Sequence, residues 1–176
     1  MSADFGARIV ALQNVMHEQH LDGLLLAGLP NVRYLTGFSG SNALVFVSQR
    51  GAVTLFTDFR YQTQVVEEVG DVARVVIAAN SLWTELWAAL PLVPSLEVIG
   101  FESAHLLHRD FERLLADGAR WQWRPARDLV EALRERKDAG EVALIEAAAR
   151  IATDALAATL PQIRAGQSET SIAGAL

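Results

Sequence analysis

Short apolar runs alternate with amphipathic stretches along most of this 176-residue chain, and this alternation restricts the fold more than any other feature. Within the amphipathic stretches, apolar residues recur at every third or fourth position, which is typical of helices with one buried face. The runs of strand length lie at 23–27, 43–48, 52–57, 73–78, 97–101 and 121–123. The predicted helices lie at 5–20, 60–69, 82–90 and 104–116.

Two neighbouring runs form a predicted hairpin. Only Gln49-Arg50-Gly51 separates 43–48 from 52–57, and the glycine permits a positive φ in so short a loop. Pro30 and Asn31 predict a turn after the first strand. Alternating strands and helices predict an α/β domain, and the hairpin makes its β-sheet mixed, with flanking helices, rather than fully parallel.

The chain changes character near residue 128, where a charged helical stretch begins. Asp138-Ala-Gly-Glu141 has the pattern of a capping box at the start of a further helix, which Pro161 ends. Ser168 is a candidate N-cap of another helix. We expect three segments: a first domain at 1–130, a linker helix at 131–137, and the truncated start of a second domain at 138–176. The apolar stripe of the 138–160 helix has no obvious partner in the first domain.

The composition limits the function classes. Hydrophobic residues make up 51% of the chain and charged residues 20%, as in a folded globular protein. The net charge of -6 argues against binding to nucleic acid, which needs clustered Lys and Arg. The chain has no cysteine, no signal peptide and no apolar run of about 20 residues, so we expect a cytoplasmic protein that does not enter membranes.

Four histidines form two pairs, His17 with His20 and His105 with His108. The zincin signature needs histidines four residues apart with an adjacent glutamate, so we assign no metal site to these pairs. Four tryptophans also occur in pairs, at 83 and 87 and at 121 and 123. Each pair can share a face, and core packing is favoured over a subunit interface.

The stretch 37–42 invites a functional interpretation. Gly37 and Gly40 enclose Phe38, so we expect an aromatic ring and the hydroxyls of Ser39 and Ser41 to be displayed beside the sheet. The alternative is an ordinary loop leading into a hairpin.

The stretch 57–61 opens a helix and carries two charged residues. Asp58 suits an N-cap, whereas Arg60 can pair with Glu67 or Glu68 or present its fork to a carboxylate. The sequence contains neither a nucleophile, base and orienter trio nor a phosphate-binding glycine loop.

Three ordered motifs resemble one enzyme family. They are YLTGFSGSNALVFV from Tyr34, TDFRYQTQV from Thr57, and Leu133-Arg134 followed by Lys137 and Glu141. In these motifs the chain resembles the Xaa-Pro peptidases, the family of aminopeptidase P, prolidase and creatinase. The resemblance implies a creatinase/prolidase-like N-terminal domain, followed by the first helices of a "pita-bread" catalytic domain.

The resemblance also implies an activity. Such enzymes hydrolyse the peptide bond before proline with two divalent metal ions, Mn or Co, held by two Asp, one His and two Glu of the C-terminal domain. None of those motif positions lies within 1–176, so we expect this fragment to be inactive.

By the same resemblance, the loop at 37–41 flanks the substrate of the neighbouring subunit in a homodimer that accepts short proline-containing peptides. Phe38, Ser39 and Ser41 are then substrate-flanking, and Tyr34 and Arg60 support them. Creatine-cleaving relatives have an arginine in this loop, whereas Ser41 and Asn42 stand here, which favours an Xaa-Pro peptidase over a creatinase. Because the family includes inactive relatives that bind peptides, the alternative is a non-catalytic peptide- or protein-binding module of the same fold.

Overall fold

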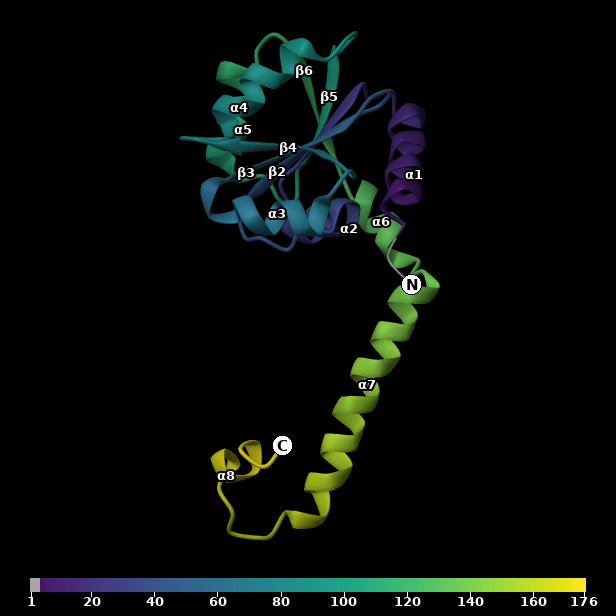
Figure 1. The fold of residues 1–176 in the computed structure, drawn as a ribbon, viewed down its shortest axis with the longest axis vertical. Coiled ribbons are helices and arrows are strands. Elements are labelled where there is room, and N and C mark those ends of the chain that lie inside the picture. Colours follow the sequence, from purple (N-terminus) through teal and green to yellow (C-terminus); the bar gives the residue numbers. More distant parts are fainter. Residues whose placement is uncertain (1–3) are drawn as a thin grey trace. The chain divides into compact units, whose positions relative to one another are not determined.

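The computed structural model describes residues 4–176, which form two compact units, 4–135 and 136–176. The first unit has a six-stranded sheet with the order β4-β3-β2-β1-β5-β6 (Figure 1). Strand β2 runs antiparallel to both neighbours, and every other adjacent pair is parallel. The predicted mixed α/β sheet is thus confirmed. The strands are β1 (Gly23–Leu26), β2 (Ala43–Ser48), β3 (Val53–Asp58), β4 (Arg74–Ala78), β5 (Val98–Glu102) and β6 (Gln122–Ala126).

Helices cover both faces of this sheet. One face packs against α1 (Phe5–Glu18), α2 (Leu29–Thr36), α3 (Gln62–Val69) and α6 (Leu129–Glu135). The other face packs against α4 (Leu82–Ala89) and α5 (His108–Asp117). Figure 1 shows the strands between α4 and α5 on one side and α1 on the other. Two hydrophobic clusters result, one on each side of the sheet.

Alternation along the strands assigns side chains to these two clusters. In β1, Leu24 and Leu26 enter the first cluster, and Leu25 enters the second beside its cross-strand partners Phe46 and Phe101. These side chains are at most 5% exposed, and burying each stabilises the fold by about 1.5–3 kcal/mol.

The tryptophans pack into the second cluster. Trp121 is buried, and Trp83, Trp87 and Trp123 are half-buried against it. The rings of Trp87 and Trp121 are stacked, with their centroids 6.3 Å apart. The expectation of core packing is confirmed.

The turn expected at Pro30 and Asn31 is wrong, because both residues lie in α2. Proline is compatible with the first turn of a helix, where its missing N–H would have no intrahelical acceptor. Buried side chains at 31, 32, 35 and 36 give α2 its inward face. The helix expected from residue 104 begins only at His108, and the last strand covers 122–126.

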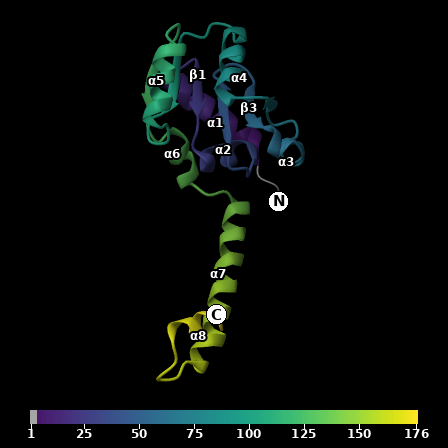
Figure 2. The same ribbon diagram turned by 90° about the vertical axis from the view of Figure 1, so that its left-hand side faces the viewer.

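The second unit consists mainly of α7 (Ala139–Thr159), a continuous helix in Figure 2, and α8 (Glu169–Ala173). The Asp138–Glu141 capping box starts α7, and Ser168 caps α8, as the sequence predicts. Short 3₁₀ segments lie at Phe59–Tyr61, Leu90–Leu92 and Leu160–Gln162. Across residues 4–176, no helix is both long enough and apolar enough to span a bilayer.

Candidate functional site

The loop at 37–42, between α2 and β2, carries most of the candidate site residues. Gly37 ends α2 in the left-handed region, with φ at +81°, and its N–H donates to the carbonyl of Arg33. A Cβ on Gly37 would also lie 3.0 Å from the carbonyl oxygen of Glu68. Gly37 therefore permits both the end of α2 and the close approach of α3.

Phe38 is buried rather than displayed, so the expectation of an exposed aromatic ring is wrong. Its side chain is 1% exposed and meets the ring of Tyr61 edge-on, with 5.4 Å between centroids. The buried Gly40 makes room for this contact, because a Cβ there would lie 2.3 Å from Cζ of Phe38. Phe38 therefore anchors the loop to the protein core.

Ser39 is exposed, and Glu68 of α3 holds it. The backbone N–H of Ser39 donates to one carboxylate oxygen at 2.7 Å, and its hydroxyl donates to the other at 2.6 Å. Gln64 donates to the same hydroxyl oxygen at 2.9 Å. Burial opposes ionisation of Glu68, but the hydrogen bonds from Ser39 and Gln64 outweigh it, so the pKa of Glu68 lies below its ordinary value.

Ser41 is exposed too, and Tyr61 fixes it. The two hydroxyl oxygens are 2.6 Å apart, and the backbone N–H of Ser41 donates to the Tyr61 oxygen at 3.2 Å. Hydrogen bonding to Ser41 is the main reason why the pKa of Tyr61 is lowered. The hydroxyls of Ser39 and Ser41 therefore occupy fixed positions although both residues face solvent.

Arg60 forms a bidentate pair with Asp58. Nε and Nη2 of Arg60 donate to the two carboxylate oxygens at 2.8 and 2.7 Å, and Asn42 donates to the same carboxylate at 2.6 Å. The alternative pairings of Arg60 with Glu67 or Glu68 are therefore wrong. The hydrogen bonds from Arg60, more than any other cause, hold the pKa of Asp58 well below its ordinary value. Asp58 also accepts from the backbone N–H of Arg60, which confirms the predicted N-cap.

Tyr34 lies at a different place, where α1, α2 and α6 meet. The guanidinium of Arg8 is 4.2 Å from the centroid of the Tyr34 ring, and the Tyr34 hydroxyl is 3.5 Å from the carbonyl oxygen of Leu133. The structure thus brings Phe38, Ser39, Ser41 and Arg60 to the α2–β2 loop and its anchors, and it places Tyr34 in helix packing.

Sequence reasoning missed the anchors Tyr61 and Glu68. A signal for them was present, because Tyr61, Gln64 and Glu68 follow one another at helical spacing and therefore share a face.

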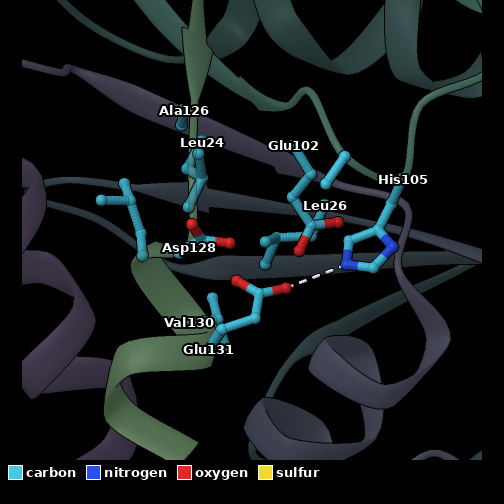
Figure 3. Close-up of a pocket in the computed structure, with 10 residues that line it drawn as sticks. Leu24, Leu26, Glu102, His105, Ala126, Asp128, Val130 and Glu131 are labelled. Carbon is cyan, nitrogen blue, oxygen red and sulfur yellow. Dashed lines mark hydrogen bonds and ion pairs between the residues drawn. The ribbon is translucent and has the colours of Figure 1, made fainter.

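A second polar cluster lies at the carboxyl ends of β1 and β5, where Figure 3 shows Glu102, His105 and Glu131 close together. Glu102 is 7% exposed, and one of its oxygens accepts from the backbone N–H groups of Ala27 and Gly28, each at 2.7 Å. The side-chain amide of Asn31 bridges two carboxylates, donating to Glu102 at 2.6 Å and to Glu131 of α6 at 2.5 Å. The cluster ties α2 and α6 to the sheet.

Burial raises the pKa of Glu102, and the hydrogen bonds offset only part of this effect. Burial also opposes ionisation of Glu131, but the hydrogen bonds from Asn31 and His105 outweigh it, and the pKa of Glu131 is lowered. The neighbouring Arg134 donates to Oδ1 of the Asn31 side chain at 2.8 Å.

His105 and His108 have different partners and do not act as a pair. His105 precedes α5 and contacts Glu131 at 2.9 Å, whereas His108 begins α5 and lies 3.8 Å from Glu112. Ligand atoms of Glu102, His105 and Glu131 lie within 4.8 Å of one another, so they are the described residues best placed to hold a cation. The contact between His105 and Glu131, together with the hydrogen bonds from Asn31 to both carboxylates, already accounts for the arrangement.

The comparisons with known proteins agree with this geometry. The sequence model of the creatinase/prolidase N-terminal domain family matches residues 8–136. The uncharacterized peptidase YqhT from Bacillus subtilis is 30% identical over 171 residues, which make up 96% of this chain and 47% of the relative. The chain thus spans about half the length of that relative.

Solved structures show the same fold. An Xaa-Pro dipeptidase from Bacillus anthracis matches with a TM-score of 0.87 at 26% identity, over 98% of this chain and 47% of that one. The N-terminal domain of the peptidase PepQ from Mycobacterium tuberculosis matches with a TM-score of 0.66 at 30% identity, over 72% of this chain and 98% of that one. The resemblance read from the motifs is confirmed, and the chain belongs to the creatinase/prolidase N-terminal domain family.

Proposed function

We propose that this chain contributes the N-terminal, non-metal-binding domain of an Xaa-Pro metallopeptidase, a dipeptidase or aminopeptidase that cleaves before proline. The Bacillus anthracis relative is named an Xaa-Pro dipeptidase, and a Streptococcus thermophilus relative an Xaa-Pro aminopeptidase. We retain the division into a domain at 1–130, a linker helix at 131–137 and the start of the catalytic domain at 138–176. The compact units divide close by, after residue 135.

The observation that carries this proposal is the fixed geometry of the α2–β2 loop. Ser39 and Ser41 face solvent, yet both hydroxyls are held by hydrogen bonds. The Ser39 hydroxyl oxygen lies 2.6 Å from a carboxylate oxygen of Glu68, and the Ser41 hydroxyl oxygen lies 2.6 Å from the Tyr61 hydroxyl oxygen. Preformed polar groups of this kind suit the recognition of a ligand, because little conformational freedom is lost on binding. In the proposed homodimer, the loop flanks the active site of the neighbouring subunit and limits it to short proline-containing peptides.

Two divalent metal ions, Mn or Co, belong to this proposal, but the residues of this chain do not fit their expected donor set. That set includes a histidine, and 136–176 contains none. Glu102, His105 and Glu131 are among the residues that line a cavity of only about 10 Å³, and they are hydrogen-bonded to their neighbours. We therefore assign the metals to catalytic-domain residues other than these 176 and expect residues 1–176 alone not to hydrolyse peptides.

We also propose a cytoplasmic location. The absence of cysteine suits a reducing compartment, and the PepQ relative is described as a cytoplasmic peptidase.

The test uses the full-length protein with Xaa-Pro dipeptides and longer peptides that have proline second. We expect Ser39→Ala to raise KM about fivefold for at least one peptide length, the effect of one lost hydrogen bond to substrate. Arg60→Gln should also raise KM, because it weakens the pair with Asp58, which holds Asn42 of the loop. The metal content, measured by mass spectrometry, is expected to stay unchanged. Arg50→Gln, in the β2–β3 turn, is the matched control and should leave KM as it is.

Unchanged kinetics in both loop variants would remove the substrate-flanking role. If the full-length protein bound such peptides without cleaving them, the non-catalytic binding module would replace the enzyme.

A further inference from the structure

A cavity of about 380 Å³ opens beside the α2–β2 loop, at the end of the sheet where the parallel strands have their carboxyl ends. The residues that line it follow β1, β4 and β5 or lie at the start of the antiparallel β2. In open α/β sheets, ligands bind beyond the carboxyl ends of the parallel strands, where neighbouring strands lead to opposite sides. Here α2, which follows β1, packs against one face of the sheet, and α5, which follows the neighbouring β5, packs against the other. The cavity is therefore where this architecture usually receives a small molecule.

One part of the cavity wall is apolar. Leu82 and Trp83 of α4 and Leu106 and Leu107 of the β5–α5 loop line it. The indole of Trp83 is half-buried. Figure 1 shows α4 and α5 on the same side of the sheet, as their shared hydrophobic cluster requires. A ring or a short aliphatic group has both the area and the chemistry to pack here.

The other part of the wall carries an excess of positive charge. Arg109 and Arg113 both approach Asp110, the one carboxylate among the described residues that line the cavity. Arg113 donates to Asp110 at 3.3 Å, whereas Nε of Arg109 stays 3.9 Å away, beyond hydrogen-bond distance. The guanidinium of Arg113 also lies 5.9 Å from the centroid of the Trp83 ring, which directs it along the apolar wall. Two guanidinium groups thus share one carboxylate, so this part of the wall is positively charged although the whole chain has a net charge of -6.

We propose that this cavity binds a small organic carboxylate, with its apolar body against Trp83 and its anionic group between Arg109 and Arg113. A planar guanidinium matches a carboxylate through two parallel hydrogen bonds. Asn42 and Asn80 border the cavity and offer further donors. Asn42 also contacts Asp58, so the cavity adjoins the anchors of the α2–β2 loop. This site is independent of the proposed peptidase activity and requires no metal.

The experiment is a titration of the 176-residue chain with benzoate, followed through the indole N–H signals in ¹H–¹⁵N NMR spectra. Trp83→Phe assigns the signal of Trp83. We expect benzoate to shift this signal along a saturable curve, whereas the uncharged benzamide shifts it far less at equal concentration. Arg109→Gln and Arg113→Gln are each expected to weaken benzoate binding about five- to tenfold, as for one lost charge-assisted hydrogen bond at a partly exposed site.

Arg50→Gln, in the β2–β3 turn at the opposite end of the sheet, is the matched control and should leave binding unchanged. The thermal midpoint of each variant shows that it is folded. The site would be refuted by shifts that do not saturate, by equal shifts with benzoate and benzamide, or by equal weakening in the Arg50→Gln control.

Discussion

The α2–β2 loop depends on one small residue at its centre. Gly40 is buried, and the Phe38 ring occupies the space that a side chain at 40 would need. A Cβ there would also lie 2.9 Å from Cδ1 of Tyr61, the residue that holds Ser41. The buried ring and the fixed hydroxyl therefore depend on the same glycine.

Replacing Gly40 with alanine is expected to lower the free energy of unfolding by about 1–3 kcal/mol, because the Phe38 ring must move out of a packed core. Thermal unfolding of the 176-residue chain measures the effect as a lower Tm. Gly6→Ala in α1 is the control, since its Cβ would meet only an ordinary contact at 3.5 Å. We expect Gly6→Ala to be neutral or slightly stabilising. Equal stability of the two variants would show that the loop repacks without cost.

The lowered pKa of Asp58 predicts how the stability of the fold depends on pH. This pKa is lower in the folded than in the unfolded protein, so the unfolded state binds protons first as the pH falls. The stabilisation by Asp58 is therefore complete above the unfolded pKa, about 3.9, and is lost as the pH falls below it. Urea unfolding at pH 6 and at pH 3 should show a smaller loss of stability for Asp58→Asn than for the unaltered chain. Equal losses would contradict the linkage.

At the level of secondary-structure elements, local patterns predict most of the sheet and its helices. The hairpin follows from Gly51 between two apolar runs, and the α7 capping box follows from Asp138 and Glu141. Helix α2 escaped prediction because Pro30 suggests a turn, although proline also suits a first helical turn.

Contacts between distant residues decide what local patterns cannot. Phe38 is buried because Tyr61 lies across from it, and Asn31 meets carboxylates that are 71 and 100 residues away. The identity of such partners is set by tertiary packing, which a local pattern does not contain.

Asn31 therefore tests how α6 is held to the sheet. Asn31→Ala leaves the carboxylates of Glu102 and Glu131 without their shared donor, and Glu102 is buried. We expect the free energy of unfolding to fall by about 3 kcal/mol, measured by urea denaturation. Asn14→Ala, an exposed position in α1, is the matched control and should change stability by less than about 0.5 kcal/mol. A loss no larger than that of the control would mean that the cluster contributes little.

At the scale of the whole molecule, residues 4–135 form one compact unit, and we expect this unit to fold as an independent domain. The PepQ N-terminal domain, solved by itself, matches 72% of this chain over 98% of its own length. A chain ending at Glu135 should unfold within about 3 °C of the 176-residue chain, because its core and the Asn31 cluster are complete.

A chain ending at Asp128 lacks α6 and with it Val130 and Glu131. It should unfold at a clearly lower temperature, which the same thermal scan records. Similar midpoints for both truncations would show that α6 is dispensable to the domain.

The reversed direction of β2 has a practical consequence. Because β2 runs against its neighbours, the α2–β2 loop lies at the same end of the sheet as the carboxyl ends of β1, β3, β4 and β5. The Gln49–Gly51 turn lies at the opposite end. Arg50 and Gly51 are exposed there. A peptide tag or a fluorophore inserted in this turn would let the protein be immobilised or observed with the proposed ligand-binding end of the sheet unobstructed.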